Sequence, residues 1–216
     1  MNNNWLYKLN RKYGRYAIHN LILYIVIGQA VVFAFDFILG SAGISLSDKL
    51  QFDVPLIMSG QAWRIISFIF VPPVSWFLLF TLLAMYFTWL IGSSLENEWG
   101  AFKFNLFYLT GVIGTIIGGL ITKSTTSVYL NLSMFLAFAS LFPDFQILLF
   151  FIIPIKVKYL AWVDAFFLLA SLITSPWPIK VAVLVSVLNL ILYFWPQITQ
   201  RVRQWRRRSQ WKRNLR

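Results

Sequence analysis

Long apolar stretches with few internal charges run through this 216-residue sequence, and they decide what it can fold into. Hydrophobic residues make up 59% of the chain and charged residues only 12%, which lies far from the composition of soluble domains. A helix needs about 20 apolar residues to cross the roughly 30 Å of hydrocarbon in a bilayer. The sequence therefore predicts an all-α, polytopic, integral membrane protein.

Six segments of the sequence are interpreted as transmembrane helices. They are residues 17–39, 75–95, 103–122, 127–142, 159–174 and 178–195. Between the fourth and fifth, the apolar stretch 145–154 is too short to cross, and Pro154 interrupts a helix, so we expect an interfacial or protein-buried segment there. Hydropathy leaves the path of residues 143–158 open.

Basic residues are divided unequally between the two sides of the predicted membrane domain, residues 17–196. With the N-terminus inside, the cytoplasmic side holds a basic arm, residues 1–16, and a basic tail, residues 197–216. It also holds Lys103, Lys156 and Lys158, whereas the other side keeps only Lys49, Arg64, Lys123 and Lys180. This asymmetry predicts that both termini are cytoplasmic.

The tail carries dense positive charge beside two tryptophans. Its basic residues include Arg201, Arg203, Arg206, Arg207, Arg208, Lys212 and Arg213. Anionic lipid attracts a basic residue near its surface by about 1 kcal/mol, so membrane lipids are expected partners of this tail. A purely topogenic role is the alternative. Since lipid explains the charge, we expect no nucleic-acid partner.

The sequence contains few residues that could bind a metal and none that could form a thiolate. It contains no cysteine and one histidine, His19. This excludes disulfides, thiolate metal sites and a site with several histidine ligands. We expect neither a metal nor another cofactor.

Two motifs carry a resemblance to a known family. The first loop contains "GQAWRIISFIF", with Trp63 and Arg64, and the second predicted helix ends in "GSSLENEWG", with Gly92, Glu96 and Gly100. Together they resemble the rhomboid superfamily, whose members carry a Trp-Arg pair in that loop and a G-x-x-x-E-x-x-x-G pattern at that helix end. The resemblance covers roughly residues 17–196 and implies a rhomboid-like bundle of six helices.

Within that superfamily the sequence is most similar to derlins, which lack protease activity. The segment "FPDFQILLFFIIPIKVKYLAW", residues 142–162, resembles their connection between the fourth and fifth helices. The resemblance implies a pseudoprotease that binds transmembrane client proteins or lipids in a lateral groove near the second and fifth helices. No tail motif for an ATPase partner follows Trp195, which favours a bacterial cell membrane over the endoplasmic reticulum.

Ser133 is the candidate nucleophile, because rhomboid proteases place a serine in a G-x-S-G turn at the head of the fourth helix. Here the turn reads Asn131-Leu132-Ser133-Met134, without either glycine. A serine also needs a base within about 3 Å, yet the sixth segment has no histidine and His19 is predicted to lie about 20 Å away. We expect a small packing residue; an intramembrane serine protease using Ser133 is the alternative.

Small residues mark the third predicted helix. They are Gly111, Gly114, Gly118 and Gly119, which include one G-x-x-x-G pair. Such a pair lets two helix backbones approach closely. Packing within the monomer is the preferred interpretation and homodimerisation the alternative, so the oligomeric state stays open.

The remaining polar residues have structural interpretations beside functional ones. Arg64 is expected to satisfy loop carbonyls where water is scarce, with a client-facing gate formed by Trp63 and Arg64 as the alternative. Glu96 is expected to partner a backbone or basic group at a helix junction. Asp36 and Asp164 lie close enough to helix ends to reach an interface, and Asp164 could pair with nearby Lys156 or Lys158.

Overall fold

The computed structural model of the chain describes residues 4–73, 77–123, 127–149, 153–177, 179–181, 183–185, 187–190 and 193. Four of its helices are long and apolar enough to cross a membrane. They are α2 (Leu21–Leu39), α6 (Leu78–Trp99), α7 (Ala101–Thr122) and α9 (Val157–Thr174). The protein is therefore a mostly helical, integral membrane protein.

Two shorter apolar helices coincide with the fourth and sixth predicted spans. The first is α8 (Val128–Leu141), and the second runs over Ile179–Leu190, interrupted by residues that are not described. Neither has the length of the other four, so six membrane crossings stay a prediction. Ser75, Pro178 and Trp195, which bound two of the predicted spans, lie outside the described residues.

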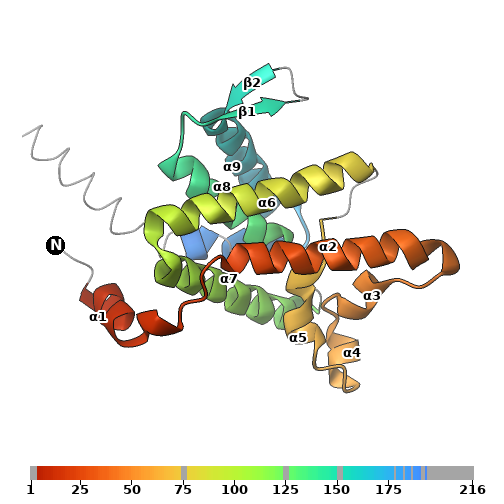
Figure 1. Ribbon diagram of the computed structural model, residues 1–216. Helices are drawn as coiled ribbons and strands as arrows, with labels where there is room; N and C mark the ends of the chain where they lie inside the picture. The colour runs from red at the N-terminus through yellow and green to blue at the C-terminus, as the bar shows by residue number, and fades with distance from the viewer. Residues whose placement is uncertain are drawn as a thin grey trace, which may run out of the picture.

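The long helices pack around a core of large apolar side chains. In Figure 1, α2 and α6 run side by side, and α6 also contacts α7 and α8. Fully buried side chains come from each of these elements: Ile22, Leu95, Phe104, Phe107, Met134 and Phe138. Because lipid tails are as apolar as these side chains, close packing rather than a hydrophobic driving force holds the helices together.

The N-terminal arm lies at one end of α7. It consists of α1 (Asn4–Tyr13) and a single 3₁₀ turn (Gly14–Tyr16), and α1 contacts α7. Figure 1 shows this arm at the opposite end of α7 from the short helices α3, α4 and α5. The arm ends at Asn20, whose left-handed backbone begins α2.

The connection between α2 and α6 folds into a compact set of short helices. After a 3₁₀ turn (Gly40–Ala42) come α3 (Leu46–Leu50), α4 (Val54–Met58), α5 (Arg64–Ser67) and a final 3₁₀ turn (Phe68–Phe70). Ser45 caps α3, and Asp53 caps α4 by accepting a hydrogen bond from the backbone N–H of Leu56 at 3.1 Å. Side-chain caps of this kind define where such short helices begin.

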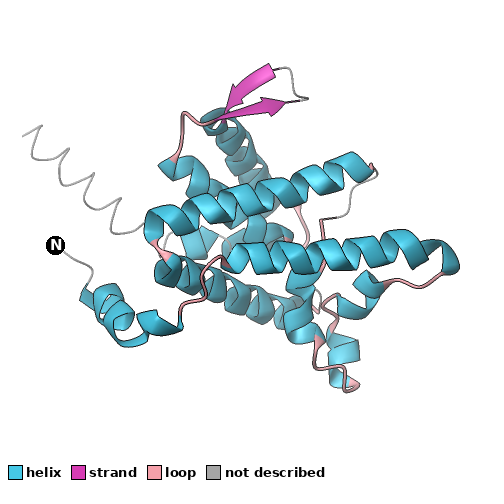
Figure 2. Ribbon diagram, in the orientation of Figure 1, coloured by secondary structure: helices cyan, strands magenta, loops and turns pink. Residues whose placement is uncertain are grey.

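The described residues are mostly helical, consistent with the all-α prediction, and they also include a short antiparallel β-hairpin formed by residues 146–149 and 153–156. Strand β1 (Gln146–Leu149) pairs with β2 (Ile153–Lys156), with Ile147 opposite Ile155. Figure 2 shows the two strands in magenta, projecting from the helices. Pro154 ends any helix here, and on a two-stranded hairpin it occupies an edge position that proline tolerates.

Candidate functional site

Ser133 lies on α8 with its hydroxyl already engaged. The side chain is 1% exposed, and its Oγ donates a hydrogen bond to the carbonyl oxygen of Leu130, one turn earlier, at 2.7 Å. Among the described residues, no hydrogen bond joins Ser133 to a histidine, lysine or carboxylate. Met134 beside it is also buried, where the rhomboid protease motif has glycine.

Three other polar residues, His19, Lys123 and Asn189, make no hydrogen bond to Ser133 in the described part of the chain. His19 is an exposed residue of the turn before α2. Lys123 is an exposed residue that ends α7. Asn189, on the last apolar helix, donates to the carbonyl of Phe107 at 3.3 Å and accepts from Thr110 Oγ1 at 2.9 Å. These bonds join the last helix to α7, so the amide of Asn189 is used in packing.

Arg64 connects the short helices of the first loop. It is 5% exposed, and its Nη1 donates to the carbonyl oxygens of Asp48 and Gln51, each at 2.8 Å. Its Nε donates to Gln61 Oε1 at 2.6 Å. The guanidinium therefore satisfies loop carbonyls, as the structural interpretation predicts.

Trp63 has a different position from its neighbour. Its side chain is 56% exposed, while its indole Nε1 donates to the carbonyl oxygen of Lys49 at 3.2 Å. Met58 and Ile66 on the same loop are also largely exposed. The loop thus buries the Arg64 guanidinium and presents apolar side chains on its surface.

The G-x-x-x-E-x-x-x-G motif forms the junction of α2, α6 and α7. A Cβ atom on Gly92 would lie 2.6 Å from Ile22 Cγ1, so only glycine permits this approach of α2 to α6. One turn later, Glu96 is 8% exposed and its Oε1 accepts the backbone N–H of Asn20 at 2.7 Å. Gly100, with φ of +81°, turns the chain from α6 into α7. The three residues have separate roles in packing, capping and turning.

The glycines of α7 meet helices of the same chain. A Cβ on Gly111 would clash with Leu130 of α8, and one on Gly114 would lie 2.6 Å from Val185 of the last helix. A Cβ on Gly118 would make only ordinary contact, at 3.5 Å from Val181. Gly119 is also buried. These contacts favour packing within the monomer.

The acidic residues of the spans differ in their partners. Asp36 accepts hydrogen bonds from the backbone N–H groups of Leu46 and Ser47, and so holds the start of α3 against α2. Asp164 pairs with neither nearby lysine in the described residues, because Lys156 and Lys158 both approach Asp144 instead. Asp164 Oδ2 is buried and has no hydrogen-bond partner among the described residues.

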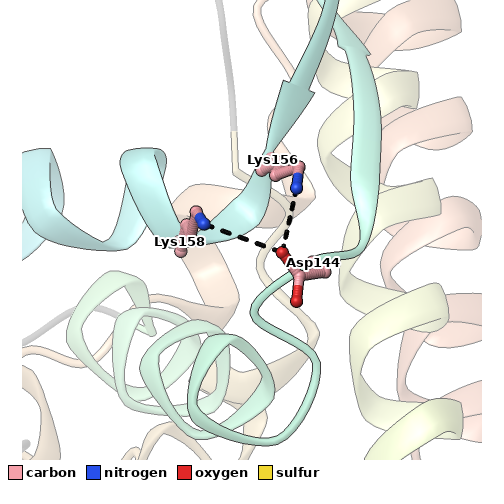
Figure 3. Close-up of polar contacts among 3 residues, drawn as sticks. All are labelled: Asp144, Lys156 and Lys158. Carbon is pink, nitrogen blue, oxygen red and sulfur yellow. Dashed lines mark hydrogen bonds and ion pairs between the residues drawn. The ribbon is translucent and has the colours of Figure 1, made fainter.

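Asp144 lies at the base of the hairpin, facing two lysines (Figure 3). Its Oδ1 is 3.1 Å from Lys156 Nζ and 3.7 Å from Lys158 Nζ. The hydrogen bond from Lys156, together with the positive charges of both lysines, holds the pKa of Asp144 below its ordinary value. All three side chains are exposed enough for water to screen the pairs, so they orient the hairpin more than they stabilise the fold.

Apolar side chains are exposed along α6 and α9, on either side of α8. Helix α8 contacts both α6 and α9. On α6 the exposed set includes Leu79, Leu82 and Tyr86; on α9 it includes Tyr159, Trp162, Phe166, Phe167 and Ile173. Trp162 is 77% exposed. These two faces are where α6 and α9 meet lipid or another apolar partner.

No protein-family model, curated protein or solved structure matches the chain. The rhomboid-like relationship therefore depends on the residues of this chain alone, and the function built on it is a proposal.

Sequence reasoning missed several residues that build this arrangement. Gln29 is buried on α2, and its Nε2 donates to the carbonyl oxygen of Ile69 at 3.0 Å. Gly28 beside it lies against the ring of Phe70. The sequence did contain a signal for this contact, a glutamine in the middle of an apolar stretch. A buried side-chain amide needs a hydrogen-bond partner. The basic tail from Arg201 to Arg213 lies outside the described residues.

Proposed function

We propose that the protein is a non-catalytic, rhomboid-like membrane protein of the derlin type. It binds transmembrane segments of client proteins, or lipids, at a lateral opening between α6 and α9. The two helices correspond to the second and fifth predicted spans, where the family resemblance implies a groove. In the proposed topology the chain crosses a bacterial cell membrane six times and keeps both termini in the cytoplasm.

The observation that carries this proposal is the exposure of aromatic and aliphatic side chains on both α6 and α9. Tyr86 on α6 and Phe166 on α9 are 51% and 68% exposed. Helix α8 packs against both helices. Two apolar faces flanking a short helix suit an apolar segment that enters sideways from the bilayer.

The surroundings of Ser133 support the non-catalytic part of the proposal. A serine acts as a nucleophile only when a base takes its proton. Here the hydroxyl proton is donated to the Leu130 carbonyl, which holds the side chain along its own helix. Serine back-bonding of this kind is common in apolar helices.

The contacts of the first loop suit a position immersed in the membrane. Trp63 and Ile66 are exposed, while Arg64 keeps the loop carbonyls satisfied. Backbone without water must have internal partners, so this loop is suited to lie in the outer leaflet.

Site-specific photocrosslinking in native membranes tests the proposed opening. A photoreactive residue at Tyr86 or Phe166 is expected to capture protein segments or lipid in a discrete pattern. The same residue at Val31, an exposed position on α2, is the matched control and is expected to capture bulk lipid only. Identical products at all three positions would contradict a binding site between α6 and α9.

A further inference from the structure

A small cavity lies between the N-terminal arm and the start of α7. Its volume is about 160 Å³, and its walls include Tyr13, Tyr16 and Ala17 from the arm. Phe102, Asn105 and Leu109 of α7 form the other side. A cavity of about 150 Å³ holds a ring the size of benzene, so this one accommodates part of a larger molecule.

Two cationic side chains lie against tyrosines that line the cavity. Lys12 Nζ lies 5.2 Å from the centre of the Tyr13 ring, and the guanidinium of Arg15 lies 4.7 Å from the centre of the Tyr16 ring. Arg15 also donates to the Tyr16 hydroxyl at 2.6 Å. No carboxylate lines the cavity, and the positive end of α7 begins at Ala101 beside it. The two cations therefore favour an anionic group.

The cavity continues into a lipid-facing surface. Leu109 lines it and is 54% exposed, and Ile113 and Ile117 follow at four-residue spacing on α7. Residues four apart share one face of a helix. A chain that leaves the cavity past Leu109 thus meets an uninterrupted apolar strip along α7.

We propose that this cavity binds an anionic phospholipid of the leaflet that contains the N-terminal arm. The phosphate is held by Lys12 and Arg15. The glycerol end of one acyl chain fills the cavity, and the rest of that chain follows α7. Phosphatidylglycerol carries the net negative charge that these residues attract, whereas phosphatidylcholine carries none. This site is separate from the opening between α6 and α9.

Native mass spectrometry of the full-length protein tests the site. The protein is released from micelles containing equal amounts of phosphatidylglycerol and phosphatidylcholine with the same acyl chains. We expect retention of one phosphatidylglycerol, lowered about fivefold for each charge removed in Lys12→Gln and Arg15→Gln. Lys49→Gln, an exposed lysine on α3, is the matched control and is expected to leave retention unchanged.

A second variant separates cavity binding from surface attraction. Ala17→Leu fills the cavity without changing any charge, and we expect it to reduce phosphatidylglycerol retention as well. Inorganic phosphate, which lacks an acyl chain, is expected not to displace the lipid. The proposal is overturned if phosphate displaces it, if phosphatidylcholine is retained equally, or if both Ala17→Leu and Arg15→Gln retain as much phosphatidylglycerol as Lys49→Gln.

Discussion

Glu96 near the end of α6 accepts a hydrogen bond from the backbone N–H of Asn20, at 2.7 Å, and so caps the start of α2. Two helices separated by a long stretch of sequence are thereby joined at one end. Gly92, one turn earlier on α6, lets Ile22 of α2 approach at the same junction. Contact and cap act together, because the close approach brings the backbone of Asn20 within reach of the carboxylate.

Removal of this cap is expected to weaken the junction. Glu96→Ala should destabilise the protein by about 2 kcal/mol, since hydrogen bonds to charged groups contribute about 1.5–3 kcal/mol. Thermal unfolding in detergent measures the change. Glu98→Ala, at an exposed position two residues later, is the control and should change stability by less than about 0.5 kcal/mol. Equal effects of the two variants would show that the cap contributes nothing.

The two glycines of the G-x-x-x-G pair should respond differently to substitution. Gly114→Ala places a methyl group against Val185, with an expected cost of about 1–3 kcal/mol from overpacking. In Gly118→Ala the added methyl group makes only ordinary van der Waals contacts. The protein should therefore be unchanged in stability or be stabilised by up to about 1 kcal/mol. Unfolding of the purified protein distinguishes them.

A double variant tests the contact directly. Val185→Ala removes the atom that a methyl group on Gly114 would meet, so Gly114→Ala with Val185→Ala should cost less than the two single changes summed. If instead Gly114→Ala and Gly118→Ala both dissociated a dimer, the pair would serve an interface between two copies of the chain.

Loss of the Arg64 guanidinium should loosen the first loop. In Arg64→Ala the carbonyls of Asp48 and Gln51 lose their donor, and each such loss costs about 1–3 kcal/mol. Hydrogen exchange should then speed up through α3 and α5. Arg64→Lys should restore little of the protection from exchange, because an ammonium group cannot reproduce the planar set of donors of a guanidinium. Unchanged exchange in Arg64→Ala would contradict the structural role.

The hairpin base should depend on pH through Asp144. Its pKa is lowered in the folded protein, so the contribution of its pairs is present above the ordinary value of 3.8 and is lost as the pH falls below it. Limited proteolysis at residues 146–156 should therefore increase on acidification below that value. Asp144→Asn should give the increased cleavage at neutral pH, whereas Asp48→Asn, an exposed aspartate on α3, should not.

Sequence patterns predicted some parts of this molecule well and others poorly. Hydropathy located α2, α7 and α9 to within about four residues, because a long apolar helix is a local property. The hydrogen bonds of Arg64 to loop carbonyls were also predictable, since a buried guanidinium in such a loop has few other partners. These features depend on the composition of one segment.

Features that depend on distant pairing escaped prediction. Lys156 meets Asp144 rather than Asp164 because the hairpin brings residues 144 and 156 together. An apolar stretch with isoleucines and a proline indicates neither a strand nor its register without its partner strand. Likewise, nothing local indicates that Asp36 binds the backbone of α3. The sequence indicated which single residues belong to the candidate site. It did not indicate which of them contact one another.

Labelling with a fluorophosphonate probe tests the central claim most directly. The full-length protein in native membranes is treated with the probe beside an added serine hydrolase that reports probe activity. With Ser133 bonded to Leu130 and without a base, we predict no labelling of this chain, and Ser133→Ala should behave as the unmodified protein does. Labelling that disappears in Ser133→Ala would contradict the account and identify a serine nucleophile.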